Sequence, residues 1–205
     1  MENQKFDRKN LRISETFLRH LRARGWARLC QMSPSKNLEY LLPAMVQKRG
    51  GIFVDCGCGD SADAVIATKY GYSSYAFDLF EPDKEKSFNH RDKNVNYVIP
   101  FEIYQKTKNL YFILQDICEN WKLPQKADFI SSYAMITLLN FEDRILFYQQ
   151  AYKNLKRKGI LIIHYPWLVS GYGLEPTDLI KKNVERIGFK VLFETNLQIV
   201  LIKSR

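Results

Sequence analysis

The chain has 205 residues, of which 46 % are hydrophobic and 26 % are charged, as in an ordinary globular protein with one sizeable core. No apolar run approaches the roughly 18 residues of a membrane-spanning helix, and the polar start MENQKFDRKNLR lacks the apolar segment of a secretory signal, so we expect a cytoplasmic protein without a membrane segment. The net charge is +9, and residues 1–50 hold most of it, with 11 Lys and Arg against 4 Asp and Glu.

The first 48 residues are expected to form a basic helical segment. Apolar residues recur at helical spacing over 14–30, and a second helical pattern runs over 37–49. Four arginines, Arg19, Arg22, Arg24 and Arg28, stand close together in the first of these patterns. Such clustering suits a nucleic acid bound through residues 5–28, or simply a solvated helix face, which we favour. We interpret residues 1–48 as a lid or a substrate-recognition segment.

From residue 49 onward, apolar runs typical of buried strands alternate with helical patterns. Strands are expected over 52–56, 74–80, 109–117, 127–135 and 160–167, and as an antiparallel pair within 189–204. Helices are expected over 61–71, 141–159 and 176–188, with Gly71 and Gly159 as the stops of the first two. This alternation predicts an α/β fold with a mainly parallel sheet whose strands are covered on both faces.

The cysteines do not form a metal-binding pattern. Cys56 and Cys58 are separated by one residue, no second close pair follows, and the three histidines stand alone. We therefore expect no metal, and we expect both thiols to fill small spaces in a tight turn.

Acidic residues follow the first three predicted strands. Asp55 and the turn GCGDSA (57–62) end the first strand, Asp78 ends the second, and Asp116 follows the third. Parallel α/β sheets bind ligands beyond the carboxyl ends of their strands, so the three acids are expected to lie at one site. The turn satisfies the dinucleotide pattern G-x-G-x-x-A, but Asp55 would place negative charge beside the pyrophosphate.

S-adenosylmethionine satisfies all three acids without phosphates. Its ammonium group can lie near Asp55, its two ribose hydroxyls can donate to Asp78, and its adenine amino group can donate to Asp116. Ile117 can then pack against the adenine ring. Trp121 is interpreted as a core residue, with a contact to adenine as the alternative.

The order of these motifs resembles the class I S-adenosylmethionine-dependent methyltransferases. FVDCGCGDS is similar to the glycine-rich first motif of that family, YAFDLF to the ribose-binding segment, LQDI to the adenine-binding segment, and LKRKGILII to the turn before strand five. Ser61 replaces a frequent third glycine, and SSYA replaces an Asn-Pro-Pro-Tyr-like tetrad, which argues against methylation of adenine in DNA. The resemblance covers about residues 35–205.

The resemblance implies a Rossmann-like methyltransferase fold: a mainly parallel seven-stranded sheet with an antiparallel last strand, helices on both faces, an N-terminal helical extension, and a cofactor-binding domain over 49–205. It implies that the cofactor is bound by Asp55, Cys56, Gly57, Cys58, Gly59, Asp78, Leu79, Asp116, Ile117, Ser132 and Tyr133.

The methyl acceptor should meet residues that follow strands four and five. His164 is the candidate general base, with a structural histidine as the alternative, and Tyr133 is a candidate catalytic residue that a packing role would also explain. Tyr165, Trp167 and Tyr172 are candidates for substrate contact.

The expected function is methyl transfer to an N or O nucleophile, with a small-molecule acceptor favoured over RNA or another nucleic acid. A NAD-dependent oxidoreductase and an inactive binding protein are the less favoured alternatives. The sequence does not determine the acceptor or the oligomeric state.

Overall fold

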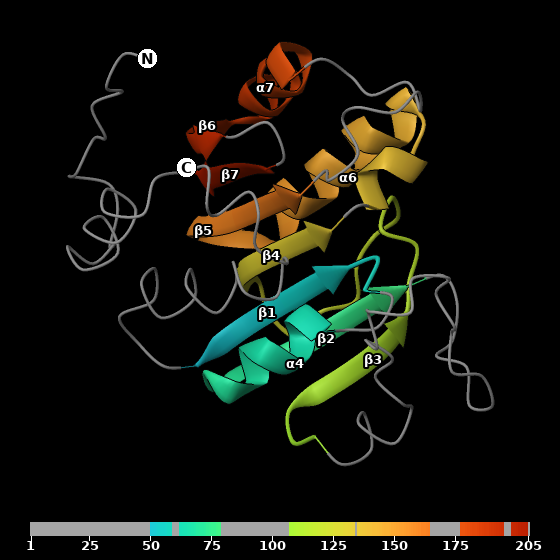
Figure 1. Ribbon diagram of the computed structural model, residues 1–205, viewed down its shortest axis with the longest axis vertical. Coiled ribbons are helices and arrows are strands. Elements are labelled where there is room, and N and C mark those ends of the chain that lie inside the picture. The colour runs from blue at the N-terminus through green and yellow to red at the C-terminus, as the bar shows by residue number, and fades with distance from the viewer. Residues whose placement is uncertain are drawn as a thin grey trace, which may run out of the picture.

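The described part of the chain is built around a seven-stranded sheet (Figure 1). The computed structural model describes residues 50–58, 62–78, 107–133, 135–164, 177–194 and 198–204. The strand order is β3-β2-β1-β4-β5-β7-β6. The strands are β1 (Gly51–Cys56), β2 (Tyr72–Asp78), β3 (Leu110–Leu114), β4 (Ala127–Tyr133), β5 (Leu155–His164), β6 (Phe189–Glu194) and β7 (Gln198–Lys203).

The sheet is parallel except at one strand. β1 pairs in parallel with β2 and β4, β2 with β3, and β4 with β5, whereas β7 lies antiparallel to both β5 and β6. The expected mainly parallel seven-stranded sheet with an antiparallel last strand is therefore confirmed. Because β1 lies inside the parallel part, its carboxyl end is flanked by the carboxyl ends of β2 and β4.

Alternating side chains of the strands build two cores, one on each face of the sheet. On one face, Val54 of β1 belongs to a cluster with residues of α6 (Phe141–Asn154) and α7 (Thr177–Ile187). On the other face, Phe53 belongs to a cluster with residues of α4 (Ala62–Lys69). The expected helices on both faces are confirmed, and burial on both faces explains why β1 reads as a continuous apolar run.

The expected helix stop at Gly71 is confirmed, and the one at Gly159 is wrong. Gly71 has φ +85° and donates its N–H to Thr68 O at 2.9 Å, which closes α4 as a glycine C-cap does. Helix α6 ends at Asn154, and residues 155–159 already belong to β5. The cause is tertiary: Leu155 is fully buried and pairs with Ala127 of β4, and Lys158 takes the left-handed conformation (φ 63°) that interrupts helical geometry.

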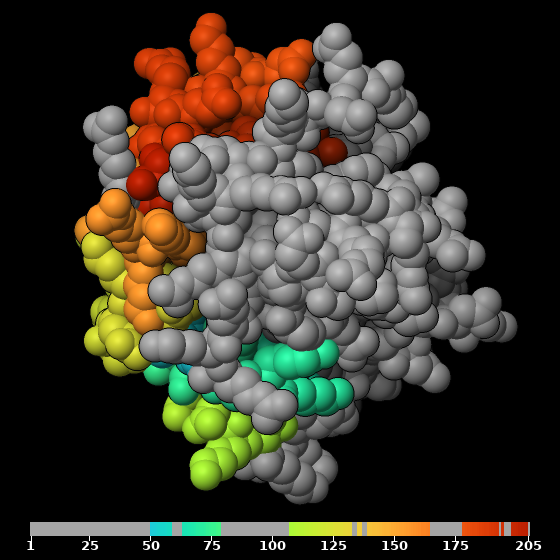
Figure 2. Space-filling model, turned by 90° about the vertical axis from the view of Figure 1, so that its left-hand side faces the viewer, coloured from blue at the N-terminus to red at the C-terminus, as the bar shows by residue number. Residues whose placement is uncertain are grey.

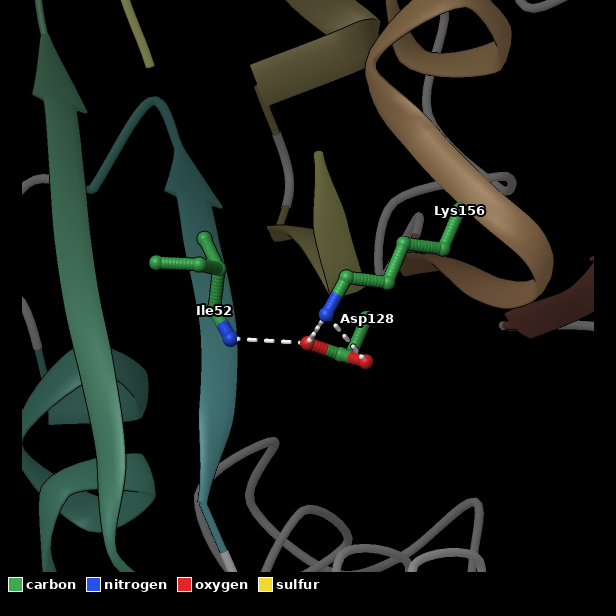
Figure 3. Close-up of polar contacts among 3 residues, drawn as sticks. All are labelled: Ile52, Asp128 and Lys156. Atoms are coloured by element: carbon green, nitrogen blue, oxygen red, sulfur yellow. Dashed lines mark hydrogen bonds and ion pairs between the residues drawn. The ribbon is translucent and has the colours of Figure 1, made fainter. Parts of the chain in front are cut away.

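Asp128 ties the amino ends of three strands together (Figure 3). Its carboxylate accepts the backbone N–H of Ile52 in β1 at 2.9 Å and binds Lys156 Nζ of β5 at 2.8 Å. Gly51 permits this approach, because a Cβ at that position would lie 2.5 Å from Asp128 Oδ2. The junction lies at the amino ends of the strands, opposite the edge that carries the predicted site.

Replacing Asp128 with alanine should lower the free energy of unfolding by about 2 kcal/mol. The main cause is the buried N–H of Ile52, which would lose its acceptor at a cost of about 1–3 kcal/mol, whereas the half-exposed pair with Lys156 adds at most about 1 kcal/mol. Asp128→Asn keeps an acceptor for Ile52 and should lose less than half as much. Urea unfolding of both variants measures this, and equal losses would contradict the assigned role of the Ile52 bond.

The described surface extends from β3 at one end of the molecule to α7 at the other (Figure 2). None of the helices in the described ranges is both long and apolar enough to cross a membrane. The proposed N-terminal segment 1–48, including its arginine cluster and residues 5–28, lies outside the described residues, as does the expected helical extension.

Candidate functional site

The carboxyl ends of the parallel strands bring the predicted acids to one edge of the sheet. Asp55 is the penultimate residue of β1, Asp78 is the last residue of β2, and Asp116 follows the end of β3 by two residues. Since β3, β2 and β1 are neighbours in the sheet (Figure 1), the three acids stand at three adjacent strand ends. This is the edge at which parallel α/β sheets bind ligands.

The glycine turn after β1 is held to the end of β2 by its backbone. The N–H groups of Gly57 and Cys58 both donate to Phe77 O, each at 2.9 Å. Gly57 has φ +68°, a conformation that costs little only for glycine. A Cβ at this position would also collide with Met135, whose own Cβ would be 2.6 Å away. The turn therefore requires glycine for both its backbone conformation and its packing.

Asp55 is buried and supports the start of α4. Its side chain is 3 % exposed, with Oδ2 accepting the N–H of Ala64 at 3.3 Å and Oδ1 accepting the Ser131 hydroxyl at 3.4 Å. A carboxylate at the first turn of a helix is favoured by the helix dipole. Asp55 thus connects β1, β4 and the helix that follows the glycine turn, in addition to bringing negative charge to this edge.

Asp78 lies beside the glycine turn. Its Oδ2 accepts the thiol of Cys58 at 4.0 Å, and its backbone carbonyl accepts the N–H of Gln115 at 2.9 Å. The first contact joins the acid to the turn, and the second continues the β2–β3 pairing past the end of β3. The carboxylate is partly exposed, so it can accept hydrogen bonds from a ligand.

Asp116 and Ile117 form a tight turn after β3. Asp116 Oδ1 accepts the N–H of Cys118 at 2.8 Å, and Ile117 is 6 % exposed. The carbonyl of Ile117 accepts the Trp121 indole N–H at 2.8 Å. Trp121 is 8 % exposed and packs edge-on against Phe77, with ring centroids 5.4 Å apart, so it is a core residue as expected.

The three described cysteines are free thiols, and Cys56 and Cys58 lie on different faces of the sheet. Cys56 belongs to the core on the α6 side and Cys58 to the core on the α4 side, which agrees with their expected packing role. Burial and the nearby charge of Asp55 raise the pKa of Cys56, and burial together with Asp116 raises the pKa of Cys118 to about 12. Across the described ranges, no group of three His, Cys, Asp or Glu side chains is placed to hold a metal ion.

The second half of the candidate site lies at the ends of β4 and β5. Ser132 is 1 % exposed and pairs in register with Cys56 of β1 and Ile163 of β5, and its hydroxyl has no hydrogen-bond partner among the described residues. His164 pairs in register with Tyr133 of β4 and with Gln198 of β7. The side chain of Tyr133 lies outside the described atoms, as do Gly59, Leu79, Tyr165, Trp167 and Tyr172.

His164 is neutral in the folded protein at physiological pH. It is 6 % exposed, and burial lowers its pKa from 6.5 to about 4. A neutral imidazole can accept a hydrogen bond from a substrate at pH 7, but this low pKa makes it a weak proton acceptor. The hydrogen-bonding role is therefore better supported than that of a strong general base.

Stability should fall as the pH is lowered from about 6.5 to 4, in part because of His164. Between these values the unfolded chain binds a proton at this residue and the folded chain does not, so unfolding takes up a proton. The loss from this residue should reach about 3 kcal/mol near pH 4 and vanish above pH 7. Urea unfolding at several pH values should show a shallower pH dependence in His164→Gln than in the wild type; parallel curves would contradict the lowered pKa.

Sequence reasoning did not identify three residues of this region: Met135, Arg144 and Gln198. Met135 contacts Gly57, Arg144 of α6 bonds to the segment after β4, and Gln198 pairs with His164. No local motif marks any of them, because each reaches the site through pairing or packing of segments distant in sequence.

The chain matches no protein-family model and no curated protein, but its fold is similar to that of several solved structures. A TehB-like SAM-dependent methyltransferase from Corynebacterium glutamicum is 17 % identical, with 93 % of this chain and 95 % of that chain covered and a TM-score of 0.60. Magnesium protoporphyrin IX methyltransferase from Synechocystis, solved with bound SAM, is 16 % identical with both chains fully covered and a TM-score of 0.62.

A third similar structure is 1,6-didemethyltoxoflavin-N1-methyltransferase from Burkholderia thailandensis, solved with 1,6-didemethyltoxoflavin and S-adenosylhomocysteine. It is 12 % identical, with 93 % of this chain and 88 % of that chain covered and a TM-score of 0.62. With six parallel strands, an antiparallel β7 and helices on both faces, this chain has the fold of the class I S-adenosylmethionine-dependent methyltransferases.

Proposed function

We propose that the protein is an S-adenosylmethionine-dependent methyltransferase. The observation that carries the proposal is that Asp55, Asp78 and Asp116 lie at the ends of three adjacent strands. They lie beside a turn in which only glycine fits at position 57. Three carboxylates disfavour the pyrophosphate of a dinucleotide and favour a ligand with one ammonium group, a ribose diol and an adenine amino group. The similar solved structures support the same cofactor, since two of them contain SAM or S-adenosylhomocysteine.

The carboxylates at the carboxyl ends of β1, β2 and β3 match the hydrogen-bond donors of this cofactor. Asp78 is partly exposed beside the turn, so its carboxylate can accept hydrogen bonds from a ribose diol. Asp116, whose Oδ1 accepts the N–H of Cys118, offers a carboxylate to an adenine amino group. Ile117 offers an apolar contact for the ring. Asp55 favours an ammonium group through its charge and holds the turn through α4.

When bound, S-adenosylmethionine supplies an electrophilic methyl group to a nucleophile on the acceptor. The chain's part is to align the acceptor and to exclude water. Neutral His164 can accept a hydrogen bond from an N–H or O–H of the acceptor, and its position at the end of β5 beside β4 suits that task. Tyr133, Tyr165, Trp167 and Tyr172 remain our proposed acceptor contacts.

Isothermal titration calorimetry tests the cofactor. We expect S-adenosylmethionine and S-adenosylhomocysteine to bind with micromolar dissociation constants, and we expect NAD to bind at least tenfold more weakly. Tighter binding of NAD would favour the oxidoreductase alternative. An absence of binding by either methionine derivative would overturn the proposed function while leaving the fold unaffected. Binding without turnover on any acceptor would favour an inactive binding protein.

We further propose a small-molecule acceptor with an N or O nucleophile. Two of the similar structures support this, since they are enzymes named for the methylation of 1,6-didemethyltoxoflavin and of magnesium protoporphyrin IX. The excess of positive charge in residues 1–50 favours RNA as the alternative. Binding of a mixed-sequence RNA between about 50 and 200 mM salt separates the two, because phosphate contacts make affinity fall steeply with salt.

A further inference from the structure

A single 3-10 turn, η2 (Met135–Leu138), connects the site to helix α6. It follows the end of β4, and its first residue, Met135, packs so closely on Gly57 that no Cβ fits between them. Because Gly57 and Cys58 are bonded to Phe77 O from the β2 side, the glycine turn is held between the end of β2 and η2. The position of η2 therefore determines how much room the glycine turn has.

Arg144 of α6 holds η2 in place. Its Nε donates to the carbonyls of Ile136 at 3.1 Å and Leu139 at 3.0 Å, so one guanidinium bridges the middle of η2 and the residue that follows it. Arg144 is only 6 % exposed, and in the described ranges no carboxylate lies within ion-pair distance of it. Arginine is rarely buried without such a partner, because removing its charge from water is costly.

The helix that carries Arg144 is firmly anchored. Asn140 caps its start by accepting the N–H of Asp143 at 2.8 Å, and Phe147 and Tyr148 on the same buried face are fully enclosed in the core. Because the backbone of Arg144 is held in place by this helix, its two hydrogen bonds define the position of η2 relative to the sheet.

We propose that Arg144 is a positioning residue for the cofactor: through η2 and Met135 it keeps the glycine turn in its binding conformation. This rests on the proposed function, since the ligand of the turn is taken to be S-adenosylmethionine. Arg144 itself is assigned no contact with the cofactor.

The chain offers a matched control in Lys203. This residue is 7 % exposed, and its Nζ donates to the carbonyls of Tyr152 at 2.6 Å and Leu155 at 2.9 Å, at the opposite end of α6. It is likewise a buried cation bonded to two carbonyls, but it lies at the other edge of the sheet from the glycine turn. Arg144→Met and Lys203→Met should therefore both lower the melting temperature.

Only Arg144→Met should weaken S-adenosylmethionine binding, by about tenfold in the dissociation constant measured by calorimetry. Arg144→Lys, which keeps the charge but not the geometry of the guanidinium, should recover part of the affinity. Equal affinity in Arg144→Met and Lys203→Met would show that Arg144 is structural only. Wild-type protein that binds no S-adenosylmethionine would instead overturn the proposed function.

The contact between Met135 and Gly57 can be tested without changing Arg144. Met135→Ala, which loosens the contact with Gly57 while keeping Arg144, should weaken binding several-fold, and combining it with Arg144→Met should add little, because both act through one contact. Hydrogen exchange without cofactor should be faster in Arg144→Met at residues 135–139 and in the peptide 51–58, but not in Lys203→Met. Unchanged exchange in the peptide 51–58 would overturn the link from Arg144 to the turn.

Discussion

Gly57→Ala should reduce S-adenosylmethionine binding by about 100-fold and lower the free energy of unfolding by about 2–5 kcal/mol. The left-handed backbone (φ +68°) costs a non-glycine residue about 1–2 kcal/mol, and the new methyl group must displace Met135 at a further cost of about 1–3 kcal/mol. Relieving the collision moves either the turn or η2, and either movement changes the surface that the ligand meets. Calorimetry and urea unfolding on the same preparation measure both effects.

Gly188→Ala is the control for this variant. Gly188 also has a positive φ (+116°), and a Cβ there would lie 2.7 Å from the hydroxyl of Tyr152, but it sits after α7 at the far end of the sheet. It should lose a similar amount of stability and keep its affinity for S-adenosylmethionine. If both variants lost affinity in parallel, the loss in Gly57→Ala would reflect general destabilisation and not the shape of the turn.

Asp78→Ala should weaken S-adenosylmethionine binding by at least tenfold, as measured by calorimetry. The proposed bonds from two ribose hydroxyls to a carboxylate are charge-assisted, and each contributes about 1.5–3 kcal/mol. Within the protein, Oδ2 of this carboxylate also accepts the thiol of Cys58 at 4.0 Å. Asp78→Asn, which retains one acceptor oxygen, should bind with intermediate affinity.

The comparison for Asp78 is Asp178→Ala. Asp178 has a side chain that is 95 % exposed, on α7, and it should leave the dissociation constant unchanged. A second comparison changes the ligand. The wild type should bind adenosine analogues that lack the ribose hydroxyls more weakly than adenosine, whereas Asp78→Ala should bind both with the same affinity. If Asp78→Ala bound S-adenosylmethionine as tightly as the wild type, Asp78 would have no part in ribose recognition.

The parts of the fold that follow from local pattern were predictable. The apolar run of β1 and the glycine turn after it are adjacent in sequence, and the turn chemistry of Gly57 acts within two residues. The antiparallel pair β6 and β7 is joined by a short connection, which favours that pairing. These features depend on residue type and spacing, so the sequence alone indicates them.

The helix expected over 141–159 ends at Asn154, which shows that local sequence pattern is not sufficient to place the end of this helix. The basic stretch after α6 continues a helical pattern, and Gly159 has the residue type of a helix stop. Because Leu155 pairs with Ala127 and Lys158 takes the left-handed conformation, β5 begins at Leu155, five residues before the expected start of the strand. Burial of Leu155 between strands outweighs the weak helical preference of a short polar segment.

The sequence by itself determined the α/β class, the parallel sheet with its antiparallel last strand, and the three acids at strand ends, because strand alternation and turn chemistry are local properties. Only the tertiary structure decided that Asp55 supports α4, that His164 is buried and neutral at pH 7, and that Arg144 bridges η2. The residue type of a charged or polar side chain does not specify whether the side chain faces water or the core. Its burial, its pKa and its partners are decided by segments that are distant in the chain and adjacent in the fold.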